Sequence, residues 1–227
     1  MSSIFLQHFP NDSGPIYQET MAGRFPVEPW NTASNAIFLL IIIYFAIKIY
    51  HSKAPHRFMV RVLWVIGASY IGGTMYHATR SHEIWLLLDW VPIIFLLIAA
   101  VYYFFSKIAL STTKKLLFFS SLIALSFMVR WLPLPKIISA SFGYIASVAP
   151  IAVPTVWYLS KTKWKNGYLV LLAFLSFGIA ITFRSLDGNY ELLPMGTHWL
   201  WHSFGGVAVF LFLSYIYRDE EYAFAKA

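Results

Sequence analysis

Apolar residues dominate seven long runs of this 227-residue chain, and short polar stretches separate the runs. Each run is near the roughly 20 residues that a helix needs to cross a bilayer. No internal repeat or low-complexity linker interrupts the pattern. The pattern therefore predicts an all-α membrane protein, a seven-transmembrane helix bundle that forms one domain over residues 1–227, with spans at approximately 33–50, 58–79, 84–105, 116–132, 137–160, 167–184 and 197–217.

The composition supports a membrane protein and narrows the choice of metal ligands. Hydrophobic residues make up 59% of the chain and charged residues only 12%, whereas a soluble domain has about 25% charged residues. Cysteine is absent, which excludes disulfides and thiolate metal sites. Histidine, aspartate and glutamate remain as the strong ligands.

The distribution of basic residues predicts the orientation of the bundle. The net charge is +7, but the bases lie between the apolar runs instead of forming one patch, which argues against a nucleic-acid partner. Twelve of the 17 Lys and Arg residues lie in or beside the connections after the first, third and fifth runs or in the C-terminal tail, and basic loops face the cytoplasm. The N-terminus, with a non-cytoplasmic segment over residues 1–30, is then outside, and the C-terminus is cytoplasmic.

Two histidines four residues apart, His198 and His202, lie on one face of the predicted last span. The predicted orientation brings His77 of the second span and Asp89 of the third to the same depth, near the non-cytoplasmic face. Three imidazoles with one open position form the ligand set of a catalytic zinc. Zinc lowers the pKa of a water that it binds to about 7 and polarises a carbonyl, and Asp89 would be a partner of the site or a general base. Such a site in apolar surroundings suits hydrolysis of a lipid amide or ester.

Structural roles for the same residues stay open at this point. His198 and His202 could be interfacial residues in an aromatic belt with the tryptophans beside them. His77 could cap the end of its helix. Asp89 could make a hydrogen bond between helices, because a carboxyl group within a span must be paired or protonated.

Other polar and small residues have structural explanations. Asn31 is a good N-cap for the first span, whereas Ser34 and Asn35 lie inside that span and are expected to bond a neighbouring helix. Two glycine pairs are expected to permit close helix packing, and the remaining polar residues of the loops are expected to be solvated. The glycines are Gly72, Gly73, Gly205 and Gly206, and the solvated set is His8, His51, His56, His82, Arg184, Asp187, Asn189 and Glu191.

Three blocks of the sequence resemble the motifs of the alkaline ceramidases, within the superfamily of seven-span hydrolases that includes the adiponectin-receptor family. The first block, residues 27–35, is similar to the family's Glu-x-x-Asn-Thr-x-Ser-Asn. The second, residues 72–92, resembles its His-x-Thr and Leu-Asp-x-x-Pro segments. The third, residues 198–202, matches its His-x-x-x-His near the last span.

The resemblance implies zinc held by His77, His198 and His202, with Asp89 orienting or deprotonating the attacking water. It implies hydrolysis of the N-acyl bond of a ceramide-type membrane lipid to a sphingoid base and a fatty acid. The metal and a nearby hydroxyl would stabilise the oxyanion. The family's serine four residues before the second-span histidine is Gly73 here, and its neighbour Thr74 could supply that hydroxyl.

The resemblance also bears on a second cation. Animal members bind calcium through an acidic N-terminal stretch that includes the counterpart of Glu28. Residues 11–19 do not reproduce the acidic run, which argues against calcium. Glu28, with Asp12 or Glu19, could still bind a cation.

Two other functions compete with a hydrolase. A receptor-like seven-span protein would bind a lipid and hold a structural metal with all four positions filled by protein, Asp89 included. A proton-coupled transporter would relay protons through Asp89 and the histidines. Pro150 and Pro154 in the fifth span favour this interpretation, because they indicate a broken helix. The hydrolase interpretation makes the chain an integral, multi-pass membrane protein with its active site near the non-cytoplasmic face. The transporter interpretation instead predicts access from both sides and little dependence on metal.

Overall fold

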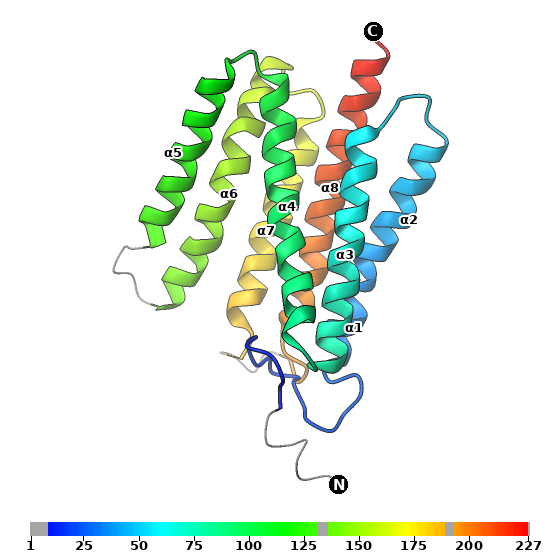
Figure 1. Cartoon of the computed structure of the whole chain (residues 1–227), viewed down its shortest axis with the longest axis vertical. Coiled ribbons are helices and arrows are strands. Elements are labelled where there is room, and N and C mark those ends of the chain that lie inside the picture. Colours follow the sequence, from blue (N-terminus) through cyan, green and yellow to red (C-terminus); the bar gives the residue numbers. More distant parts are fainter. Residues whose placement is uncertain (1–8, 131–135, 189–192, 227) are drawn as a thin grey trace. The chain divides into compact units, whose positions relative to one another are not determined.

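A computed structural model describes residues 9–130, 136–188 and 193–226. Eight helices and no strand form within those residues (Figure 1). In chain order they are α1 (Pro29–Ser34), α2 (Ala36–Tyr50), α3 (Arg57–Thr79), α4 (Glu83–Lys107), α5 (Thr112–Arg130), α6 (Lys136–Lys161), α7 (Gly167–Leu186) and α8 (His198–Phe224). The prediction of an all-α protein is therefore confirmed.

Helices occupy the described residues of all seven predicted apolar runs. Five segments of the described chain are long and apolar enough to cross a membrane: α1 with α2, α3, α4, α7 and α8. Their lengths run from 20 to 27 residues, which covers the thickness of a bilayer core. These helices indicate a multi-pass membrane protein.

The chain divides into two compact units. The first contains Met1–Leu96 and Tyr168–Ala227, and the second contains Leu97–Gly167. In the second unit α5 packs along α6, and aromatic rings of α4 contact both helices, as in the edge-to-face pair of Phe105 and Phe118. The first unit carries every residue of the predicted metal site.

Small residues bring the helices of the first unit close together. A Cβ on Gly72 would lie 2.3 Å from the backbone carbon of Leu88, so α3 and α4 touch backbone to backbone there. A Cβ on Gly206 would lie 2.6 Å from Ile37, which locks α8 against α2. The predicted packing role holds for these two glycines, whereas Gly205 has open space around it.

The outer faces of the first unit are apolar. Trp64 is 79% exposed, and large aliphatic and aromatic side chains on four other helices are exposed as well. Exposed apolar surface of this extent is costly in water and is the normal surface of a helix in lipid. Examples are Leu40, Phe95, Leu171, Leu175 and Val207.

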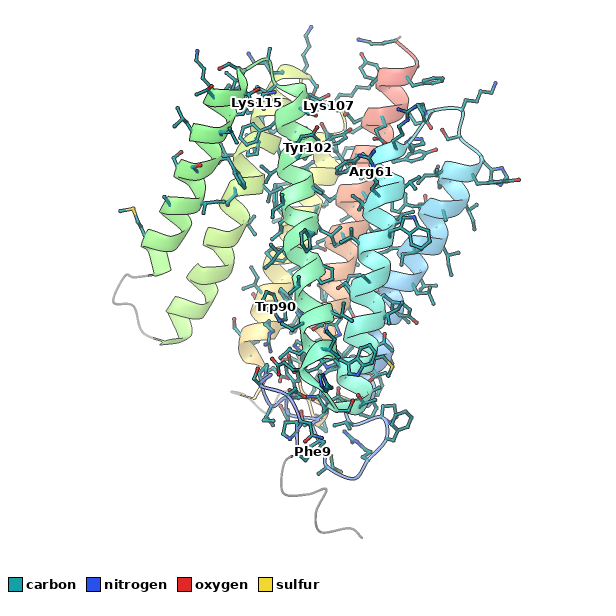
Figure 2. All side chains as sticks on the ribbon, viewed as in Figure 1. Phe9, Arg61, Trp90, Tyr102, Lys107 and Lys115 are labelled. Atoms are coloured by element: carbon teal, nitrogen blue, oxygen red, sulfur yellow. The ribbon has the colours of Figure 1, made fainter. Side chains whose placement is uncertain are left out.

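Different segments of the chain lie at the two ends of the first unit. The described part of the N-terminal segment, residues 9–28, lies at the end where α3 finishes and α8 begins (Figure 1). Figure 2 shows Trp90 of α4 in the half nearer Phe9, whereas Arg61 of α3 lies near the opposite end.

A buried histidine at that opposite end corrects one prediction. His56 is not solvated, because only 2% of its surface is exposed. Its Nδ1 lies 2.8 Å from Glu220 Oε2 and its Nε2 lies 2.9 Å from Glu221 Oε1, and its ring stacks on Tyr217. The carboxylates come from α8, more than a hundred residues away in sequence, so no local pattern could reveal them.

Candidate metal centre

Three buried histidines from two helices form a cluster in the first unit. His77 comes from the last turn of α3, and His198 and His202 come from the first two turns of α8. One ligand nitrogen from each lies within 4.8 Å of the other two, and the side chains are between 0% and 5% exposed. The predicted convergence of these residues is confirmed, and the group could hold a metal ion.

His77 is prepared as a ligand by its neighbours. Its Nδ1 forms a short hydrogen bond with a carboxylate oxygen of Glu28, and its Nε2 is buried without a partner among the described residues. A carboxylate accepts and cannot donate when ionised, so Nδ1 carries the proton and Nε2 holds the lone pair. Metal-bound histidines commonly have this tautomer, in which a carboxylate accepts from the ring N–H on the side away from the metal.

Glu28 is engaged by four donors. Its carboxylate accepts hydrogen bonds from Thr20 at 2.6 Å, from Arg80 at 2.7 Å and from the Asn31 amide at 3.1 Å, besides the bond with His77. Burial alone would raise the pKa of Glu28, but the hydrogen bonds from His77, Thr20 and Arg80 hold the pKa below its usual value.

The guanidinium of Arg80 pairs with two of the carboxylates that the sequence offers for a second cation. Arg80 bridges Glu28 and Asp12, and the side chains of all three are fully buried. The contacts favour a role for Glu28 in orienting His77 over its predicted role as a ligand of another cation. Glu19, the other acidic residue considered, accepts instead from the backbone N–H groups of Trp30 and Asn31 at the start of α1.

His202 is held by the first helix. Its Nδ1 lies 3.2 Å from the carbonyl oxygen of Asn31 and 2.8 Å from Ser34 Oγ. Since the carbonyl only accepts, a proton on Nδ1 satisfies this bond and leaves Nε2 for a metal. Ser34 therefore bonds a neighbouring helix as predicted, whereas the Asn35 amide donates to Asn31 of its own segment.

His198 has different surroundings from the other two. The Tyr17 ring stacks on its imidazole with 3.8 Å between ring centroids, and Arg184 Nη1 lies 3.3 Å from its Nδ1. Burial raises the pKa of Tyr17 well above its usual value. The N-terminal segment thus covers the metal centre with a neutral aromatic ring, and a cation lies beside one ligand.

Asp187 positions the start of α8. Its Oδ1 accepts from the backbone N–H of Thr197 at 2.7 Å and from that of His198 at 3.0 Å. This side chain satisfies two of the N–H groups that a helix leaves unpaired at its first turn. The prediction that the outer loop is solvated is wrong for Asp187, and Asn189 and Glu191 lie outside the described residues.

The absence of a side chain at Gly73 makes room for Asp89. A Cβ at Gly73 would lie 2.5 Å from Asp89 Oδ1 and 3.0 Å from Asn35 Oδ1. The carboxyl of Asp89 therefore rests against the α3 backbone one turn before His77, in the space that a serine would occupy. No hydrogen bond reaches this carboxyl from the described residues, and Asp89 is not in the group of potential ligand atoms.

Thr74 supplies an unpaired hydroxyl near this place in α3. Its Oγ1 is buried without a hydrogen-bond partner among the described residues, although a threonine in a helix can usually bond a carbonyl of the preceding turn. Positions three apart share a helix face, so Thr74 and His77 lie on the same side of α3.

The residues of the cluster fit zinc. They are neutral nitrogen ligands, three in number, in a chain without thiolates, and His77 Nε2 is an orphaned buried atom that a metal would satisfy. Three protein ligands leave one position of a tetrahedral ion open.

Sequence reasoning missed four residues around the centre. Tyr17, Arg80, Arg184 and Asp187 contact the histidines or their partners through segments far apart in the chain. None of the four carried a local signal: even Asp187, which bonds the start of α8, lies eleven residues before His198, too far for the N-cap pattern.

Comparison with known proteins does not assign the chain to a family. No family model matches the chain, and no curated protein matches it.

Proposed function

We propose that this chain is a zinc-dependent hydrolase of seven membrane spans that cleaves the N-acyl amide of a ceramide-type lipid to a sphingoid base and a fatty acid. The proposal rests on the sequence motifs and on one structural observation above all. Three buried imidazoles converge inside an apolar bundle, with the lone pair of His77 Nε2 left without a protein partner. Buried polar groups of this kind are expensive unless they serve a ligand.

The chain's own residues can carry the remaining roles. Zinc, when bound by His77, His198 and His202, would supply a Lewis acid for the amide carbonyl and would acidify a water. Asp89 would accept the proton of that water, since its carboxyl accepts no hydrogen bond from the described residues. The unpaired hydroxyl of Thr74 would donate to the oxygen that becomes negative.

The proposed orientation puts the metal centre at the non-cytoplasmic side. It rests on the basic residues counted along the chain, and α5 and α6 are the fourth and fifth of the proposed seven spans. The apolar outer faces of the helices support a substrate that reaches the site from the bilayer. A lipid amide fits such a route better than a soluble peptide.

The count of protein ligands bears on the receptor-like alternative. A structural zinc takes four protein ligands, and Asp89 is the residue that would complete the set. The group of potential ligand atoms within the described residues contains three histidines and no carboxylate, which favours the hydrolase.

Product identification tests the proposal. Purified protein in detergent is loaded with zinc and incubated with a ceramide and, separately, with a diacylglycerol, and free fatty acid and sphingoid base are quantified by mass spectrometry. We expect both products from the ceramide, their loss on chelation and their return with zinc. The Asp89→Asn variant should keep its zinc but lose hydrolysis by about 100-fold or more. Release of no fatty acid from either lipid by zinc-loaded protein would refute the hydrolase and favour the receptor.

A further inference from the structure

Arg80 is a fully buried guanidinium whose five N–H groups all donate. Nε and Nη2 donate to the two carboxylate oxygens of Asp12 at 2.9 and 2.6 Å, and Nη1 donates to Glu28 Oε1 at 2.7 Å. The remaining two N–H groups donate to the carbonyl oxygens of Pro15 at 3.0 Å and Gly14 at 3.3 Å. An arginine has five such donors, so its hydrogen-bonding capacity is used completely.

The backbone around Arg80 joins the same two segments. The Asn11 N–H donates to the Arg80 carbonyl at 3.0 Å, and the Glu28 N–H donates to the His77 carbonyl at 3.0 Å. Arg80 itself has a φ of 47°, and this left-handed residue ends α3 and turns its side chain back to the N-terminal segment. Residues 11–28 are therefore attached to the end of α3 at both their beginning and their finish.

A chain of charged contacts runs from this segment to the metal centre. Asp12 pairs with Arg80, Arg80 pairs with Glu28, and Glu28 bonds His77 Nδ1. The four side chains in this series of contacts are all 0% exposed. Without Arg80, the carboxylate of Glu28 would lose the cation that holds it in place, and His77 would lose the fixed acceptor that sets its tautomer.

We propose that Arg80 is a positioning residue of the metal centre. It holds the Glu28 carboxylate in place, Glu28 fixes the tautomer and ring of His77, and Asp12 anchors Arg80 from the N-terminal segment. Metal affinity therefore depends on a side chain that touches no ligand. The inference rests on the metal centre and does not require that the reaction is lipid hydrolysis.

Zinc affinity of full-length protein in detergent tests the inference, measured by competition with a chromophoric chelator. Loss of a partner that orients a ligand typically weakens metal binding by about 10–100-fold, and we expect this loss for Arg80→Met and a smaller loss for Asp12→Asn. Arg24→Met is the matched control, because Arg24 lies in the same segment but donates only to backbone carbonyls. Its affinity should equal that of the wild type.

A double variant distinguishes positioning from general destabilisation. If Arg80 acts through Glu28, Arg80→Met combined with Glu28→Gln should bind zinc no more weakly than the weaker single variant, and the cobalt-substituted absorption spectrum should change alike in all three. The inference would be overturned if folded Arg80→Met bound zinc as tightly as the wild type. If Arg80→Met does not fold, wild-type affinity in Asp12→Asn would overturn it instead. Additive losses in the double variant would overturn it as well. Lipid hydrolysis is not part of the readout, so its absence would count only against the proposed reaction.

Discussion

His198 differs from the other two ligands because a guanidinium lies beside it. Arginine only donates, so Arg184 makes His198 Nδ1 the acceptor in their 3.3 Å contact. A neutral imidazole has a single lone pair, and the contact with Arg184 uses the lone pair that a metal needs. A metal bound through Nε2 requires the proton to move to Nδ1 and this bond to Arg184 to break.

Replacing Arg184 should therefore strengthen metal binding. We expect Arg184→Gln to bind zinc at least about fivefold more tightly, since a unit charge about 4 Å away is worth about 1 kcal/mol even in water-like surroundings. Titration with a competing chelator measures the change. Weaker binding would mean that Arg184 holds His198 in position instead of competing with the metal.

The close approach of Asp89 to α3 makes Gly73 sensitive to any side chain. We expect Gly73→Ala to displace the Asp89 carboxyl, because the new Cβ would lie 2.5 Å from Oδ1. Lipid hydrolysis should fall at least about tenfold, in the manner of a misplaced catalytic group, while zinc content stays unchanged. Gly178→Ala on α7 is the control, since its Cβ would meet no atom within 4 Å. Equal activity of both variants would contradict the role of Asp89.

Candidate metal ligands were predictable from the sequence where their spacing along a helix indicated a shared face. The i, i+4 spacing of His198 and His202 predicted two of the candidate ligands from one helix. The predicted depth of His77 in the membrane predicted the third. The residues that hold these histidines were not predictable, because Glu28 and Tyr17 meet the histidines, and Arg80 meets Glu28, only after the N-terminal segment folds back over the helix ends.

At the scale of the helices, hydrophobic length was a sufficient guide. Within the described residues each predicted run became helix, although α8 continues seven residues past the predicted end at 217. An apolar stretch of that length must satisfy its backbone internally in lipid. The first run divides at Asn35 into α1 and α2, a break that the polar Ser34 and Asn35 accompany. Loop contacts were not predictable, as His56 shows.

His56 joins the α2–α3 loop to the end of α8 and should matter for stability alone. We expect His56→Ala to lower the free energy of unfolding by about 1–3 kcal/mol, because it removes the bonds to Glu220 and Glu221 and the buried ring that stacks on Tyr217. Thermal unfolding in detergent measures this loss, with the exposed His51→Ala as control. Zinc affinity should not change, and a weaker affinity would show that the two ends of the bundle are coupled.

At the scale of the whole molecule, the predicted orientation can be tested by labelling. The chain has no cysteine, so a single introduced thiol reports one position. Ser13→Cys, in the N-terminal segment, should react with a membrane-impermeant maleimide from the non-cytoplasmic side. Lys53→Cys, between α2 and α3, should react only after the membrane is permeabilised. The reverse pattern would place the metal centre at the cytoplasmic face.

The metal content of purified protein tests the central claim most directly. Elemental analysis after zinc loading and removal of excess ion should give about one zinc per chain for a three-histidine site, and none above background for His202→Ala. The exposed His82→Ala should match the wild type. Wild-type protein without zinc, or His202→Ala with its zinc intact, would contradict a metal centre built from His77, His198 and His202.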